Sequence, residues 1–499
     1  MGSTFMGLET SKRGLQTQQS ALYTTGHNIS NANTLGYSRQ RVNMEATSGF
    51  PGVGMNAGTM PGFLGTGVQA GAIQRVRDSF VDQQYRGEST KLGYWDTRSK
   101  AVGQIEDVMN EPSDSGLQKS LSQFWGSLQD LAVHPENGGA RKVVIERGKA
   151  VADSFNYMNK SLQELKTNNA QEIDISTTDI NSILNQIVSL NKQISSVEPN
   201  GYLPNDLYDA RDALVDQLAG YLPIEMGTPI PSGGNALKGM AEGSLVINIK
   251  TKNGSIPLLS GTETGQLSAV KTGDTIDGFA ISAFGSNAAG SLDVGTMEQD
   301  KGRLKSLVDT NNTLLPKMIA DLDKMANAFM KEFNDQHKAG HGIGDNSTGN
   351  AFFEGEGTGA GGIKVSETII QDPSLIAASS KPGEEGNGEN AKELGNIQFK
   401  KLDGTAADKL DGATIQTFFQ GVIGQLGVDG QQADKMKFNS ETLMISVSNR
   451  RDSISAVSLD EEMTNMIQFQ QAYNASARMV TVVDETLDKI INGMGVVGR

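Results

Sequence analysis

The sequence predicts a mainly α-helical, multidomain fold with β insertions: paired N- and C-terminal coiled-coil helices, an elongated helical-bundle domain and a small β-rich outer domain. Three observations favour this fold class. Apolar residues repeat every seven positions near both ends of the chain, a helical pattern runs over residues 140–197, and short β-type runs replace it over residues 226–300. Because an apolar row on a helix is stable only when another element covers it, the helices are expected to pack side by side.

A first helix is expected close to the N-terminus, where four apolar residues stand at seven-residue spacing: Leu8, Leu15, Leu22 and Ile29. The positions between them are mostly polar, so the stripe suits one partner helix. An Asn-rich stretch at residues 28–33 is expected to end the helix, because Asn and Gly tolerate the left-handed backbone found at helix ends. Loops and a hairpin are expected over residues 38–78, where Gly and Pro punctuate the chain.

The strongest helical signal lies over residues 140–197. Two rows of apolar residues at seven-residue spacing predict a long rod-like helix there. A return helix is expected after the turn at residues 199–201, and another helix over residues 303–335. Between them, a Gly-, Ser- and Thr-rich segment that contains the apolar run 245–249 predicts the strands of a small β domain.

The last helical stretch is expected over residues 435–492 and carries a seam of its own. Its members are apolar residues at and beside seven-residue spacing: Met466, Phe469, Tyr473, Val480, Val483, Leu487 and Ile490. Matching stripes at the two ends of the chain predict that the first and last helices pair, with the rest looped out as stacked domains. We expect the two stripes together to form the seam at which subunits assemble.

Four domains are expected, two of them built from segments far apart in the sequence. Changes of pattern and turn residues set their boundaries. They are a terminal coiled-coil domain (1–45 with 457–499), a helical rod-like domain (46–225 with 301–345 and 436–456), an inserted β-rich domain (226–300) and a small mixed α/β domain (346–435).

The composition argues against several classes of function. The chain has no cysteine, which excludes disulfides, thiolate zinc sites and cysteine nucleophiles. Its formal net charge of −15 argues against a nucleic-acid surface. No apolar run reaches the roughly 18 residues that a membrane span needs, and the N-terminal segment lacks the apolar stretch of a cleaved signal peptide.

The sequence offers no convincing catalytic or metal site. His337 and His341 have the i, i+4 spacing of a helical metal pair, but Gly340 and Gly342 flank the second histidine and no glutamate stands between the two. Residues 357–362 are Gly-rich like a dinucleotide turn but lack the surrounding strand–helix unit. We therefore predict that the chain is not an enzyme, needs no cofactor and no metal, and binds neither nucleic acid nor membrane.

Distinctive polar motifs lie beside the two seams. Their members are Gly26, Asn28, Asn31, Asn33, Gly36 and Tyr37 near the N-terminus, and Leu459, Asp460, Glu461, Glu462, Gln471 and Ala472 near the C-terminus. The first group resembles the pattern Gly-His-Asn-Ile-Ala-Asn-Ala-Asn-Thr-x-Gly-Tyr of the flagellar rod, hook and hook-associated axial proteins, and the second resembles the matching C-terminal segment of that family. Ala456 departs from the family pattern, which has Gly there, so the turn before the last helix is expected to differ slightly.

The resemblance implies a structural subunit of the bacterial flagellum that joins the hook to the filament. Such a subunit is exported unfolded by the flagellar type III system, with a dedicated chaperone at its C-terminal helix. It then polymerises as a ring at the distal end of the hook, outside the cell, with the hook protein below and a second junction protein above. This route would explain why a signal peptide is missing.

Other interpretations remain open at this point. The chain could be another flagellar axial protein of the hook, the rod or the filament. A secreted adhesin or enzyme with its active part in residues 226–435 is a further alternative. Because the seam is narrow, we also expect the termini to stay mobile in the free subunit and to order only against neighbouring copies.

Overall fold

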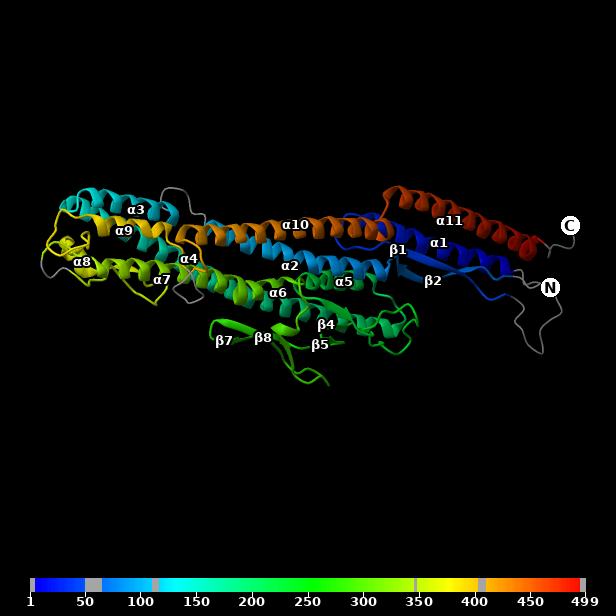
Figure 1. The fold of residues 1–499 in the computed structure, drawn as a ribbon. Coiled ribbons are helices and arrows are strands. Elements are labelled where there is room, and N and C mark those ends of the chain that lie inside the picture. The colour runs from blue at the N-terminus through cyan, green and yellow to red at the C-terminus, as the bar shows by residue number, and fades with distance from the viewer. Residues whose placement is uncertain (1–4, 50–64, 110–115, 345–347, 403–409, 494–499) are drawn as a thin grey trace.

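The computed structural model describes residues 5–49, 65–109, 116–344, 348–402 and 410–493. Figure 1 shows an elongated molecule with both termini at one end. That end holds α1 (Met6–Ser30) and α11 (Leu459–Asp488), and the opposite end holds α3 (Leu117–Val133), α8 (Glu367–Gln371) and α9 (Glu389–Asn396). The predicted fold class is confirmed, because long helices dominate and the sheets are small and antiparallel.

One helix, α4 (Gly138–Val197), runs along much of the body, as the heptad rows predict. It begins after Asn137, whose side chain accepts hydrogen bonds from the backbone N–H groups of Gly139 and Ala140. Three long helices pack against α4: α2 (Ser79–Met109), α5 (Asn205–Tyr221) and α7 (Leu315–Ala339). A short helix, α6 (Arg303–Asp309), leads into α7 through one π-helical turn, Thr310–Leu314.

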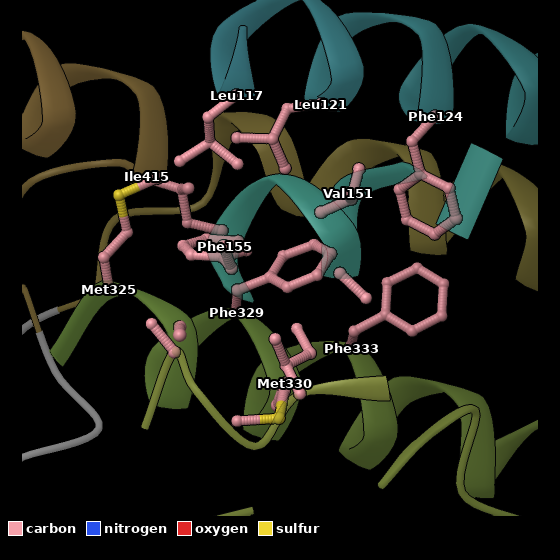
Figure 2. Close-up of a cluster of buried hydrophobic side chains, with 14 of the residues drawn as sticks. Leu117, Leu121, Phe124, Val151, Phe155, Met325, Phe329, Met330, Phe333 and Ile415 are labelled. Carbon is pink, nitrogen blue, oxygen red and sulfur yellow. The ribbon is translucent and has the colours of Figure 1, made fainter. Parts of the chain in front are cut away.

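An aromatic cluster fills the interior where α3, α4 and α7 meet (Figure 2). Phe124 of α3, Phe155 of α4 and Phe329 of α7 are each fully buried. The ring centres of Phe124 and Phe329 lie 6.0 Å apart in an edge-to-face arrangement, which adds to the stabilisation from burial. This end of the body therefore has its own dense apolar core.

Two buried polar residues of α7 hold the chain segments that follow the helix. Asn334 donates to the backbone oxygen of Phe353 (2.8 Å) and accepts from the N–H of the same residue (2.9 Å). His337 donates from Nδ1 to the backbone oxygen of Asn350 (2.7 Å) and accepts at Nε2 from the N–H of Ala377 (3.0 Å). Burial lowers the pKa of His337 to about 4, so the imidazole is neutral near pH 7.

A β-rich part lies on one flank of α4 (Figure 1). One antiparallel sheet has four strands: β3 (Ile224–Met226), β4 (Val246–Thr251), β5 (Gly254–Ser260) and β6 (Glu263–Thr264). The other has three: β7 (Leu267–Thr272), β8 (Thr275–Ile281) and β9 (Gly290–Asp293). Apolar residues of these strands share one core with α5 and the C-terminal half of α4. The strand predicted at residues 245–249 is confirmed as β4.

Asparagine side chains from the helices close the ends of two of these strands. Asn181 of α4 donates to the backbone oxygen of Leu267 and accepts from the N–H of the same residue, both at 2.8 Å. Asn312, in the π-helical turn, makes the same pair of bonds to Ile276 at 2.7 and 3.0 Å. We call this arrangement an amide clamp: a carboxamide carries the donor and acceptor of a peptide group, so it pairs with a strand much as another strand would.

One long helix crosses an expected domain boundary. The small mixed domain is predicted to end at residue 435, but α10 (Ile415–Ser455) runs unbroken across that position. Glycine at every third residue from Gly421 to Gly430 hides the helix in the sequence, because each Gly costs about 1 kcal/mol of helix propensity relative to Ala. Packing along α2 outweighs this cost: a β-carbon on Gly430 would lie 3.3 Å from Val102 and 3.0 Å from Glu106.

The hairpin expected within residues 38–78 consists of β1 (Gln40–Ala46) and β2 (Val68–Arg75), which pair antiparallel. Helix α1 packs against both strands and against α11. A second small antiparallel pair, β10 (Phe353–Glu354) with β11 (Lys364–Val365), lies at the opposite end of the body. Within the described residues, no helix is long and apolar enough to span a membrane.

Candidate functional site at the paired termini

Helices α1 and α11 lie side by side (Figure 1). Three close approaches define how they align: a β-carbon on Gly7 would lie 3.7 Å from Val483, one on Gly14 would lie 3.2 Å from Ser476, and Asn28 bonds to Glu462 at 3.0 Å. In each pair the two residue numbers add to 490, so the helices run antiparallel in one constant register.

All but one of the residues of the predicted seam lie on these two helices, and the seam is only partly covered. Its partly buried members are Leu8, Leu15, Leu22 and Ile29 on α1, and Met466, Phe469, Tyr473, Val480, Val483 and Leu487 on α11. Ile490 lies beyond the end of α11 and is 46% exposed. The only buried residue of α11 is Glu462, a carboxylate. A helix pair of this kind has apolar surface left for a further partner.

At the body end of the pair, Asn28 uses its full hydrogen-bonding capacity. Its Oδ1 accepts from the N–H of Gln40 (3.0 Å) and from the hydroxyl of Tyr37 (2.8 Å). Its Nδ2 donates to the backbone oxygen of Gln40 (2.8 Å) and to Oε2 of Glu462 (3.0 Å). Asn28 thus forms an amide clamp on β1 and also contacts α11, a set of bonds that aspartate could not make because it lacks the donor.

Glu462 joins the two ends of the chain. It is 2% exposed, and its Oε1 accepts from Nε of Arg39 at 2.8 Å. The same guanidinium donates from Nη1 to Oε2 of Glu461 at 2.6 Å. The guanidinium of Arg39 therefore neutralises the buried carboxylate, and the amide of Asn28 donates a hydrogen bond to its other oxygen. We call Asn28, Tyr37, Arg39, Gln40 and Glu462 the latch.

The latch lies where three chain segments pass between the terminal pair and the body. The N–H of Arg39 donates to the backbone oxygen of Ser455, the last residue of α10, at 2.8 Å. The N–H of Val76, just after β2, donates to the backbone oxygen of Arg39 at 2.8 Å. Residue 39 therefore connects the segment after α1, the segment before α2 and the break between α10 and α11.

Helix α5 anchors the latch to the body. Oδ2 of Asp209 accepts from the N–H of Ser38 at 2.9 Å, and Oδ1 of Asp206 accepts from the side chain of Gln40 at 2.9 Å. Burial, followed by the nearby carboxylates of Asp206 and Asp209, raises the pKa of Tyr37, so its hydroxyl remains a hydrogen-bond donor.

Beside the latch, arginines and carboxylates from four elements form one network. Arg75 of β2 contacts Asp209 at 2.7 Å and Asp212 at 2.9 Å, and Arg451 of α10 contacts Asp216 at 2.6 Å. Arg86 of α2 bonds to both Asp212 (3.2 Å) and Asp216 (2.7 Å). Burial alone would raise the pKa of Asp212, but the surrounding arginines lower it to about 2, so the carboxylate is ionised near pH 7.

The other motif residues lie around the latch without joining it. Gly36 has a positive φ of 82°, and a β-carbon there would approach Ala213 to 3.4 Å. Asn31 donates to the backbone oxygen of His27 at the end of α1 (3.1 Å). The remaining motif positions are exposed or partly buried: Gly26, Asn33, Leu459, Asp460, Gln471 and Ala472.

The family model described as "Flagellar hook-associated protein FlgK helical domain" matches residues 102–353. Flagellar hook-associated protein 1 of Bacillus subtilis (strain 168) is 44% identical over 100% of both chains. The chain belongs to the flagellar hook-associated protein 1 family. It is therefore a structural protein of the flagellum, the appendage that extends outside the cell.

Further matches cover the two sides of the latch in this hook-associated family member. Models of flagellar basal body rod proteins match residues 8–37 and 451–493. Flagellar hook-associated protein 1 of Escherichia coli (strain K12) is 25% identical over 96% of this chain and 98% of that one. The solved flagellar hook junction protein FlgK from Burkholderia pseudomallei matches with a TM-score of 0.60 and 14% identity over 75% of this chain and 100% of that chain, which supports the fold.

Sequence reasoning on this hook-associated protein missed the anchor of the latch. Asp206, Asp209, Asp212 and Asp216 stand on α5 at spacings of three and four, which places acidic groups along one face of a helix. The arginine pair at residues 75 and 77 was the complementary signal. Neither the row of aspartates nor the arginine pair by itself indicates that these two segments are in contact.

Proposed function

We propose that this chain joins the hook to the filament by polymerising as a ring at the distal end of the hook. The hook protein lies below the ring and a second junction protein lies above it. One observation carries the proposal: α11 buries a single residue, a carboxylate, and leaves large apolar side chains such as Ile467 (61% exposed) in solvent. Adjacent copies would cover this half-open seam, so the terminal pair gains its full stability on assembly.

The open apolar face of α11 also bears on how the chain is exported. We propose that the chain leaves the cell unfolded through the flagellar type III system, with a dedicated chaperone on its C-terminal helix. An amphipathic helix with an open apolar face suits recognition in a groove of such a partner. The division into four domains stays a prediction.

We further propose that the protein works through contacts and not through catalysis. The charged groups of the latch engage one another: Arg39 holds Glu461 and Glu462, and Asn28 holds Glu462 from the other side. Across the part of the chain that the structure describes, no cluster of three or more His, Asp or Glu side chains could hold a metal ion.

Electron microscopy of a deletion strain, with immunogold labelling of sheared wild-type flagella, tests the proposal. We expect hooks without filaments in the deletion strain, and gold at the distal end of the hook in the wild type. Label along the whole hook, rod or filament would assign the chain to another axial role. Normal flagella in the deletion strain, with hydrolase or adhesive activity in purified protein, would overturn it.

A further inference from the structure

Large apolar side chains are concentrated on the outside of the last two helices. Of the 27 exposed large hydrophobic residues in the described part of the chain, 12 lie between residues 428 and 491. Seven belong to α11 and the turn that follows it. The other five form what we call the α10 patch: Val428 (58% exposed), Met436 (37%), Phe438 (68%), Leu443 (52%) and Ile445 (55%).

In this stretch α10 places small residues toward the body and large apolar residues toward solvent, the reverse of an ordinary surface helix. Toward the body it buries small residues, Ala433 (1% exposed) and Ser440 (4%). Phe438 and Ile445, seven residues apart, follow the opposite side, since a two-residue step turns a helix by roughly 200°. Helices usually place large apolar groups inward, and contiguous exposed ones mark a contact surface.

We propose that the α10 patch binds a second copy of this chain within the ring. The inference rests on the proposed function but concerns a surface of the body, away from the terminal seam. Helices α10 and α11 follow each other along the same edge of the molecule, separated only by residues 456–458 (Figure 1). A copy that covers the open side of α11 can therefore extend along this edge, past the mostly polar residues 446–453, to the α10 patch.

Charge also favours a second copy as the occupant. The chain carries a net charge of −15, so identical subunits repel one another over most of their surface. Between residues 428 and 449 the charged side chains nearly cancel: Asp429, Asp434 and Glu441 against Lys435 and Lys437, a net of −1. A strip of low net charge with exposed apolar side chains is where two acidic copies can approach with a small electrostatic penalty.

Photo-crosslinking in intact flagella tests the contact directly. Phe438 is replaced by p-benzoylphenylalanine, and Tyr157 of α4, which is 51% exposed, is replaced in the same way as the matched control. After irradiation we expect an adduct of twice the subunit mass at position 438 and none at 157, with every peptide of the adduct derived from this chain. No adduct at 438, an adduct with a different protein, or equal adducts at both positions would overturn the proposal.

A paired substitution measures the consequence. Phe438→Ser with Ile445→Ser should leave the thermal unfolding of the monomer unchanged, lower the number of filaments at least tenfold and raise the amount of secreted monomer. The control, Tyr157→Ser with Ile175→Ser, alters two exposed residues of α4 and should assemble normally. If wild-type protein labels the distal hook and the α10 variant assembles like it, the α10 contact fails while the junction role stands. If wild-type protein is absent from that position, the proposed function fails first.

Discussion

Two adjacent carboxylates that share one arginine provide a sharp test of the latch. Arg39 binds both, but the side chain of Glu462 is 3% exposed whereas that of Glu461 is 62% exposed. In Glu462→Gln the shape is kept, the charge is lost, and an amide donor competes with the donors of Arg39 and Asn28. Breaking a buried ion pair by removing one partner costs about 3–5 kcal/mol. Glu461→Gln, the matched control, removes a surface pair that contributes about 0–1 kcal/mol.

Native-state hydrogen exchange on peptides from β1 and the start of α11 measures the difference. Since about 1.4 kcal/mol corresponds to a factor of ten, exchange in Glu462→Gln should be roughly 140- to 4,000-fold faster than in the wild type. Glu461→Gln should stay within about fivefold of the wild type. Equal effects of the two substitutions, or wild-type exchange in Glu462→Gln, would refute the role assigned to the buried carboxylate.

Three further predictions concern other parts of the molecule. Amides of residues 5–30 and 465–490 should be weakly protected in the free monomer because the seam residues of α1 and α11 are only partly buried, and strong protection there would contradict ordering upon assembly. Stability should fall as pH drops from about 6.5 toward 4, because the folded pKa of His337 is about 4 and the unfolded chain takes up the proton first; His337→Gln should remove about 3 kcal/mol of this dependence in urea titrations, and an unchanged pH slope would count against it. Asn181→Asp should weaken the attachment of the β-rich part by about 1–3 kcal/mol and speed its limited proteolysis, because a carboxylate cannot donate. Asn168→Asp, exposed on the same helix, should change stability by less than about 0.5 kcal/mol, and equal proteolysis of both variants would contradict the clamp.

The parts of the fold that could be predicted are those with a repeating apolar pattern in the local sequence. The heptad rows of α4 and of the terminal pair predict long helices, and the apolar run at β4 predicts a strand, because each pattern is complete within one short stretch of sequence. The first half of α10 was missed although Ile415, Phe419 and Leu426 stand at helical spacing, because the four glycines within residues 421–430 lower the helix propensity, a cost that packing on α2 outweighs.

The latch illustrates a second limit. The motif singled out Asn28, Tyr37 and Glu462, but Asn28 and Glu462 are 434 residues apart, and no pattern within either segment states that they meet. The acidic face of α5 was missed for the same reason. Contacts between distant segments depend on how the whole body packs. That packing brings together helix ends that are far apart in the sequence.

The amide clamp explains why an asparagine occupies the centre of the latch. Asn181, Asn312 and Asn334 each hold both backbone groups of one residue in an extended segment, so the clamp is this chain's recurrent way of joining a helix to an extended segment. Asn28 adds to the same geometry a second donor bond, to Glu462. Without α11, the second donor of Asn28 and the guanidinium of Arg39 would both lose their buried acceptor, and the hairpin would lose part of its support. The clamp therefore makes the joint at the base of α1 depend on the far end of the chain, so the two termini are expected to dock at the joint together.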